Sequence, residues 1–141
     1  MSVPPFIPRA GLLAAVALLP SLLRRLRNPV VRVEPGELKH RLDSKGDVTI
    51  VDVREPAEFA GALGHIAGAR NLPVGELDRR TSELDGLEQC PLVVVCRTDK
   101  RSATAARLLH QTGFARVAIL RGGMEQWNRE KLPTEATAEG P

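Results

Sequence analysis

Three short runs of apolar, largely β-branched residues constrain the fold of this chain more than any other feature of its sequence. They occupy residues 49–53, 92–95 and 117–120, and each is nearly continuous rather than alternating. Strands of this kind are covered on both faces, as in parallel sheets that lie between two layers of helices. Stretches of helical character separate the runs, so strands and helices alternate along the chain. We therefore expect an α/β fold with a mainly parallel sheet.

Shorter elements and the boundaries of the domain complete this expectation. Short extended pieces are expected at 31–33 and 69–71, and helices after Glu34 and at 56–60, 75–84, 102–112 and 124–130. With 141 residues, the chain is long enough for one core and too short for two. We expect one domain over 29–132, an N-terminal extension over 1–28 and a disordered polar tail over 133–141.

The two cysteines, Cys90 and Cys96, flank the apolar run at 92–95. At the two ends of an extended strand their Cα atoms lie roughly 20 Å apart, whereas a disulfide requires less than about 7 Å. They therefore cannot pair, and a free thiol fits a reducing compartment. Cys96 follows the strand at its carboxyl end, where parallel sheets bind ligands, whereas Cys90 precedes the strand and is interpreted as incidental.

The segment after Cys96 predicts an anion-binding loop. Residues 97–101 are polar, and Ser102 is a plausible N-cap for the helix that follows. A loop that closes onto a helix N-terminus collects unpaired backbone N–H groups, and the helix dipole adds to their attraction for an anion. The loop also holds three basic side chains against one acidic one, which favours the thiolate and makes Cys96 a candidate nucleophile. The alternative is that Cys96 is a buried apolar residue that ends a strand.

Five motifs follow one another along the chain in a recognisable order. They are IVDVRE at 50–55 with Glu58-Phe59, GHIAGARNLP at 64–73, VCRTDKRSA at 95–103, Gly113-Phe114, and LRGGM at 120–124 with Trp127. Through these motifs the chain resembles the rhodanese domain over residues 31–132, which is nearly the whole of the expected domain.

The resemblance implies a rhodanese-like three-layer fold with a five-stranded parallel sheet and helices on both faces. It also implies a ping-pong sulfurtransferase of the thiosulfate type. Cys96 would take sulfane sulfur from thiosulfate or a similar anionic donor, hold it as a persulfide and pass it to cyanide or a thiol. No cofactor is expected. The substrate-binding residues carried over from the family are Arg97, Thr98, Asp99, Lys100, Arg101 and Ser102.

Within this resemblance, the six residues Cys96 to Arg101 would form a cradle whose N–H groups stabilise the persulfide. Arg97 and Arg101 would position an anionic donor, with Lys100 in support. The chain departs from many relatives at the fourth loop position, where Asp99 stands in place of glycine. Aspartate tolerates unusual backbone angles, so the cradle is expected to persist, but its charge puts the physiological donor in doubt.

Other motif residues are interpreted as scaffold. Asp52 and Arg54 are expected to form a structural hydrogen-bonded or ionic group rather than catalytic acids and bases. His65 is a less favoured candidate for a general base, and Trp127 is expected to anchor the packing of the last helix. The sequence has no metal-ligand spacing, so no metal site is expected.

Two rival functions remain open. A phosphatase related in fold would place five residues between its cysteine and its arginine, whereas four separate Cys96 from Arg101. The shorter ring fits a sulfur atom better than a tetrahedral phosphate. The other rival is a non-catalytic, membrane-attached binding or sensing module, which the retention of Cys96 disfavours.

The N-terminal extension carries the basic character of the chain. Residues 1–32 contain five arginines and no acid, while the rest has more acidic than basic side chains. The extension therefore favours a membrane surface over nucleic acid, which the low aromatic content also disfavours. Its apolar segment at 10–23 would form a helix of about 21 Å, shorter than a bilayer core of about 30 Å. A membrane anchor, a secretory signal and a helix packed on the domain or on a second copy all remain possible. The expected location is the cytoplasm or the cytoplasmic side of a membrane, and the oligomeric state stays open.

Overall fold

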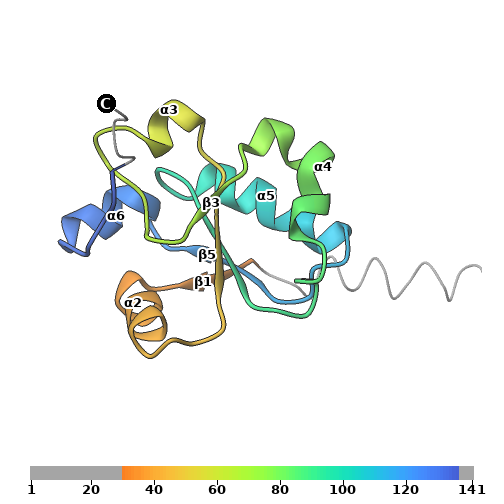
Figure 1. Ribbon diagram of the computed structural model, residues 1–141, viewed down its shortest axis with the longest axis horizontal. Helices are drawn as coiled ribbons and strands as arrows, with labels where there is room; N and C mark the ends of the chain where they lie inside the picture. The colour runs from red at the N-terminus through yellow and green to blue at the C-terminus, as the bar shows by residue number, and fades with distance from the viewer. Residues whose placement is uncertain (1–29, 137–141) are drawn as a thin grey trace, which may run out of the picture.

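The computed structural model describes residues 30–136, which form one five-stranded sheet with helices on both faces (Figure 1). The strands are β1 (Val31–Val33), β2 (Thr49–Asp52), β3 (Arg70–Asn71), β4 (Leu92–Val95) and β5 (Val117–Leu120). All pairs are parallel and the strand order is β1-β5-β4-β2-β3, so β4 lies in the middle. The expected α/β fold with a five-stranded parallel sheet is confirmed.

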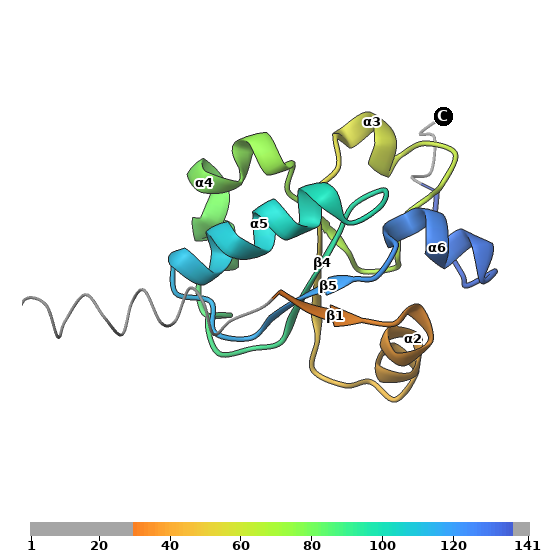
Figure 2. The ribbon, with the colours of Figure 1, turned by 180° about the vertical axis from the view of Figure 1, so that it is seen from behind.

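Two helical layers cover the sheet. The helices are α2 (Pro35–Asp43), α3 (Pro56–Phe59), α4 (Leu77–Arg80), α5 (Lys100–Gln111) and α6 (Gly123–Arg129), with 3₁₀ turns η1 (Val74–Glu76) and η2 (Thr81–Leu84). The views from both sides show α4 and α5 on one side of the sheet and α2 on the other (Figure 2).

Side chains of β4 alternate between the two layers, which explains its continuous apolar sequence. Leu92 and Val94 pack in the cluster that includes Leu109 of α5. Val93 and Val95 pack in the opposite cluster with the side chains of α2 and α6, including Trp127. Because successive side chains point to opposite faces, a strand between two helical layers needs an apolar residue at every position.

Two helix expectations differ from the structure. The expected helix at 75–84 is divided into η1, α4 and η2. The helix after Cys96 begins at Lys100, with Asp99 at the N-cap position, so the expectation of Ser102 as N-cap is wrong. The reason is that Asp99 already accepts a backbone hydrogen bond from Ala103 at 3.1 Å, which closes the first turn three residues early.

The segment after Leu132 also differs from its expectation. The indole Nε1 of Trp127 donates to the carbonyl of Pro133 at 2.9 Å. The backbones of His65 and Glu135 exchange two hydrogen bonds, at 2.8 and 2.9 Å, as an antiparallel bridge. The expected disorder of the tail is therefore wrong for residues 133–136, because backbone pairing holds a segment whatever its polarity. Residues 137–141 lie outside the described residues.

The expected extension over 1–28 also lies outside the described residues, and its three interpretations remain expectations. Between residues 30 and 136, no helix is both long enough and apolar enough to cross a membrane.

Candidate active site

Cys96 lies at the carboxyl end of the central strand β4, at the start of the turn that leads into α5. It is buried, and it belongs to the apolar cluster between the sheet and α5. Cys90 lies before β4 and is partly exposed, and both thiols are free. The structure therefore separates the two cysteines by the length of the strand, as expected.

Six consecutive backbone amides, those of residues 97–102, lead into the first turn of α5 without an acceptor among the described residues. Within the described part of the chain, no oxygen accepts a hydrogen bond from the N–H groups of residues 97–102. The next amide, that of Ala103, is the first to be paired. Unpaired amides at the N-terminus of a 12-residue helix create a positive potential that an anion satisfies. The amides of 97–101 belong to the cradle expected at Cys96 to Arg101, whose binding of a persulfide remains a prediction.

The carbonyls of the same loop are anchored by α6. The amide of Met124 donates to the carbonyl of Cys96 at 2.9 Å, and that of Glu125 donates to the carbonyl of Arg97 at 3.0 Å. In a planar trans peptide the C=O and N–H groups point in opposite directions. Fixing these two carbonyls on α6 therefore turns the amides of Arg97 and Thr98 away from that helix.

Gly123 makes this anchoring possible. Its φ is +58°, and a Cβ there would lie 2.2 Å from the carbonyl oxygen of Thr98 and 2.3 Å from that of Cys96. No side chain fits at such distances, so the N-terminus of α6 reaches the loop only because this residue is glycine. Sequence reasoning did not find this contact of Gly123 with the cysteine loop.

Ser102 lies in the first turn of α5 with its side chain fully buried. Its hydroxyl has no hydrogen-bond partner among the described residues. A buried hydroxyl without a partner is costly, because it has lost its bonds to water without replacing them. This unpartnered hydroxyl belongs to the same first turn of α5 as the unpaired amides of residues 100–102.

Arg101 is engaged by a carboxylate of α3. Its two terminal nitrogens donate to the two oxygens of Glu58 at 2.6 and 2.8 Å. The hydrogen bond from Arg101 is the main cause that lowers the pKa of Glu58 from 4.5 to about 2, against the opposing effect of burial. The pKa of the Arg101 guanidinium is raised, first by its hydrogen bond to Glu58, with smaller contributions from the charges of Glu58 and Cys96.

The other charged side chains of the loop lie farther from their partners than Arg101 lies from Glu58. Arg97 lies 3.6 Å from Glu125 of α6, and Asp99 lies 3.7 Å from Arg32 of β1. Lys100 is exposed, and no ion pair joins it to any carboxylate between residues 30 and 136. The structure thus brings the expected site residues together, but pairs both loop arginines with carboxylates.

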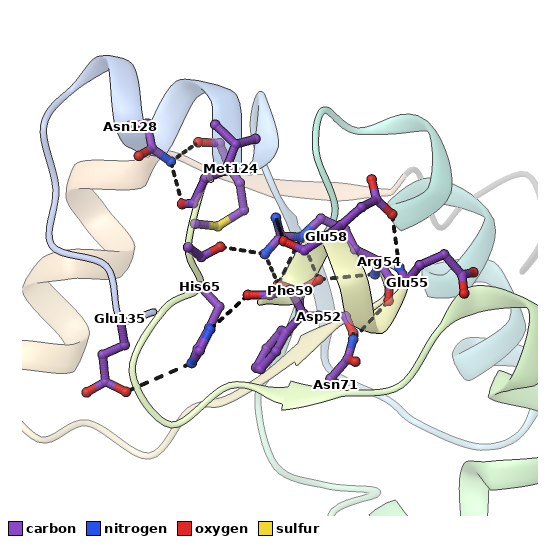
Figure 3. A network of polar contacts seen from close by, with 12 residues as sticks. Asp52, Arg54, Glu55, Glu58, Phe59, His65, Asn71, Met124, Asn128 and Glu135 are labelled. Carbon is purple, nitrogen blue, oxygen red and sulfur yellow. Dashed lines mark hydrogen bonds and ion pairs between the residues drawn. The ribbon is translucent and has the colours of Figure 1, made fainter. Parts of the chain in front are cut away.

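Arg54 fixes α3 and therefore the position of Glu58 (Figure 3). Its guanidinium donates to both oxygens of Asp52, at 2.9 and 2.7 Å. It also donates to the carbonyl of Glu58 at 3.2 Å and to that of Gly64 at 2.8 Å. Asp52 and Arg54 are each 1% exposed, so the structural role expected for this pair is confirmed.

His65 contacts Phe59 and Glu135 rather than the cysteine loop. Its Nδ1 lies 3.0 Å from the carbonyl of Phe59, and its ring stacks on that phenyl ring at 3.8 Å. Its Nε2 lies 4.0 Å from Glu135 (Figure 3). In the described structure no hydrogen bond joins His65 to residues 96–102, so nothing in its contacts favours a general base.

Sequence reasoning did not find Glu58 as a partner of the loop. The spacing of Glu55 and Glu58 is that of a capping box, and both of its hydrogen bonds are present at the start of α3. That signal could have found the local role of Glu58. Its bond to Arg101, 43 residues away, depends on the sheet order and has no local signal.

Comparisons with known proteins agree with this geometry. A sequence model of the family described as "Rhodanese-like domain" matches residues 34–130. A sulfurtransferase of Allochromatium vinosum is 38% identical over 107 residues, which cover 76% of this chain and 96% of that one. The thiosulfate sulfurtransferase GlpE of Ectopseudomonas mendocina is 39% identical over 109 residues, covering 77% and 93%.

Coverage differs among relatives. The Bacillus subtilis protein YqhL, whose function is uncharacterised, is 40% identical over 78 residues, and the match spans 55% of this chain and 59% of that relative. Among solved structures, a rhodanese-related protein of Thermoplasma volcanium superposes with a TM-score of 0.64 at 29% identity, over 73% of this chain and 95% of that one.

Proposed function

The chain belongs to the rhodanese-like domain family, and from this we propose that it is a sulfurtransferase in which Cys96 carries the transferred sulfur. The observation that carries the proposal is the set of six amides without a protein acceptor, next to a buried cysteine at the end of β4. Preoriented amides stabilise a sulfur anion without reorganising during the reaction. The sulfurtransferase names of two relatives support the same reaction class.

The reaction proceeds in two displacements. In the first, the Cys96 thiolate attacks the outer sulfur of the donor. A bond forms between Sγ and that sulfur, and the donor's own bond to it breaks. The leaving group keeps the electron pair: sulfite leaves from thiosulfate, or a thiolate leaves from a persulfide.

In the second displacement, cyanide or a thiolate attacks the outer sulfur of the Cys96 persulfide. Thiocyanate or a new persulfide is released, and the Cys96 thiolate is restored. Each step moves one sulfur atom without its bonding electron pair and consumes no external oxidant or reductant. The reaction therefore closes as a cycle on one cysteine.

We assign the roles of the loop by their chemistry. The amides of 97–102 solvate the persulfide anion, and the Ser102 hydroxyl, which has no partner among the described residues, is available as one more donor to a bound anion. Lys100 attracts an anionic donor, since it has no carboxylate partner in the described structure. Arg97, Thr98, Asp99 and Arg101 form the wall of the substrate site, and Arg32 offsets the charge of Asp99.

The test is sulfur loading followed by turnover. The full chain is treated with thiosulfate and its intact mass is measured, and thiocyanate formation is then followed after addition of cyanide. We expect the mass of one added sulfur and steady thiocyanate release. Cys96→Ser should abolish both, whereas Cys90→Ser is the matched control and should retain both. Sulfur that remains on the Cys96→Ser chain would contradict the assignment.

A further inference from the structure

Glu58 is the one carboxylate that binds the cysteine loop through both of its oxygens, among the residues that the structure describes. It reaches the loop from α3, which follows β2 rather than β4. Its pKa of about 2 keeps it ionised at any physiological pH. The positive charge of Arg101 is therefore offset at all times by a carboxylate in direct contact.

Glu58 is also held so that it cannot easily leave Arg101. One of its oxygens accepts the backbone N–H of Glu55 at 3.0 Å, as part of the capping box. Its carbonyl accepts a bond from Arg54, which is itself fixed by the buried Asp52. A carboxylate fixed at both its backbone and its side chain keeps its partner in one geometry.

The consequence for the loop is a low net charge. The loop side chains Arg97, Asp99, Lys100 and Arg101, with their partners Glu125, Arg32 and Glu58, carry a net charge of only +1. Glu58 also takes one N–H from each terminal nitrogen of Arg101, so fewer of its five donors remain for the oxygens of a small anion. Attraction for a dianion is weakened on both counts.

We propose, on the basis of the proposed sulfurtransferase function, that Glu58 is a specificity-determining residue. By neutralising Arg101 it makes the site favour an organic persulfide, whose sulfur is carried by a group with little negative charge, over the thiosulfate dianion. In this loading step the Cys96 thiolate attacks the outer sulfur of R–S–SH. The S–S bond of the donor breaks, RS⁻ leaves with the electron pair, and Cys96–S–SH forms.

The experiment compares two donors on the full chain and on three variants. The donors are thiosulfate and cysteamine persulfide, whose ammonium group offsets the charge of its persulfide. Glu58→Gln removes the negative charge while an amide oxygen can still accept the Glu55 N–H. Glu83→Gln is the matched control, because Glu83 binds Arg80 through both oxygens on the exposed surface of η2. The third variant combines Glu58→Gln with Arg101→Gln.

We expect Glu58→Gln to lower the KM for thiosulfate by about fivefold or more, and to change that for cysteamine persulfide by less than about twofold. The gain for thiosulfate should weaken at high ionic strength and disappear in the double variant. Glu83→Gln should behave as the unchanged chain with both donors.

Three outcomes would overturn the inference. If Glu58→Gln changes both donors equally, or neither, Glu58 has only a structural role, and the sulfurtransferase function stands without it. A gain for thiosulfate that persists in the double variant would also exclude Arg101 as the group that Glu58 acts through. If the unchanged chain takes sulfur from neither donor, the proposed function fails, and this inference fails with it.

Discussion

Two arginine–carboxylate pairs meet at α3, and they differ in their surroundings. The Asp52–Arg54 pair is buried, with each side chain 1% exposed, whereas the side chains of Glu58 and Arg101 are each 34% exposed. Both pairs use two oxygens of the carboxylate. The buried pair fixes backbone carbonyls on α3 and after it, while the partly exposed pair joins α3 to Arg101 of the cysteine loop. The same chemistry thus supports the scaffold in one place and the site in the other.

The largest effect is expected from the buried pair. Asp52→Ala leaves the Arg54 guanidinium buried without its counterion, and we expect a loss of about 3–5 kcal/mol in the free energy of unfolding. Urea unfolding of the variant and of the unchanged chain measures the difference. If the free energy of unfolding fell by less than about 1 kcal/mol, the buried pair would contribute no more to stability than a partly exposed pair.

The next effect tests whether α6, rather than the exposed pair, sets the loop backbone. Gly123→Ala places a Cβ against the carbonyls of Cys96 and Thr98, and we expect kcat/KM for sulfur transfer to fall about 100-fold. Gly113→Ala is the matched control, because Gly113 also has a positive φ, +107°, but has open space around its Cβ position. Equal losses in both variants would assign the effect to backbone strain and not to the loop.

A smaller effect is expected from the exposed pair on stability. Arg101→Gln should lower the free energy of unfolding by about 0.5–1 kcal/mol, because solvent screens a pair that is one third exposed. The same urea experiment measures it. A loss as large as that of Asp52→Ala would erase the distinction between scaffold and site.

The smallest effect is a pH dependence. Because the pKa of Glu58 is lowered from 4.5 to about 2, its contribution to stability is complete above pH 4.5 and is lost as the pH falls toward 2. The stability difference between the unchanged chain and Glu58→Gln should therefore shrink between pH 5 and pH 3. Unfolding curves at several pH values in this range measure it, and a constant difference would contradict the ionised pair.

The sequence was informative where the signal is local. The apolar run at 92–95 predicted a buried strand, and the polar residues after Cys96 predicted an anion-binding turn, since both patterns lie within one stretch of chain. Glu58 and Gly123 act on that turn from 38 and 27 residues away, and their contacts depend on the strand order. The N-cap at Asp99 and the backbone pairing of Glu135 were missed because main-chain hydrogen bonds leave little trace in residue type.

Because α6 anchors the carbonyls of the loop, the backbone of the loop is held independently of the side chains at residues 97–101. The groups that we propose to bind the sulfur are amides, which substitution at residues 97–101 leaves in place, apart from a change to proline. The side chains at these positions are therefore free to diverge in size and charge while the reactive centre persists. A domain built in this way can acquire a new sulfur donor through surface mutations alone, without first losing its ability to carry sulfur.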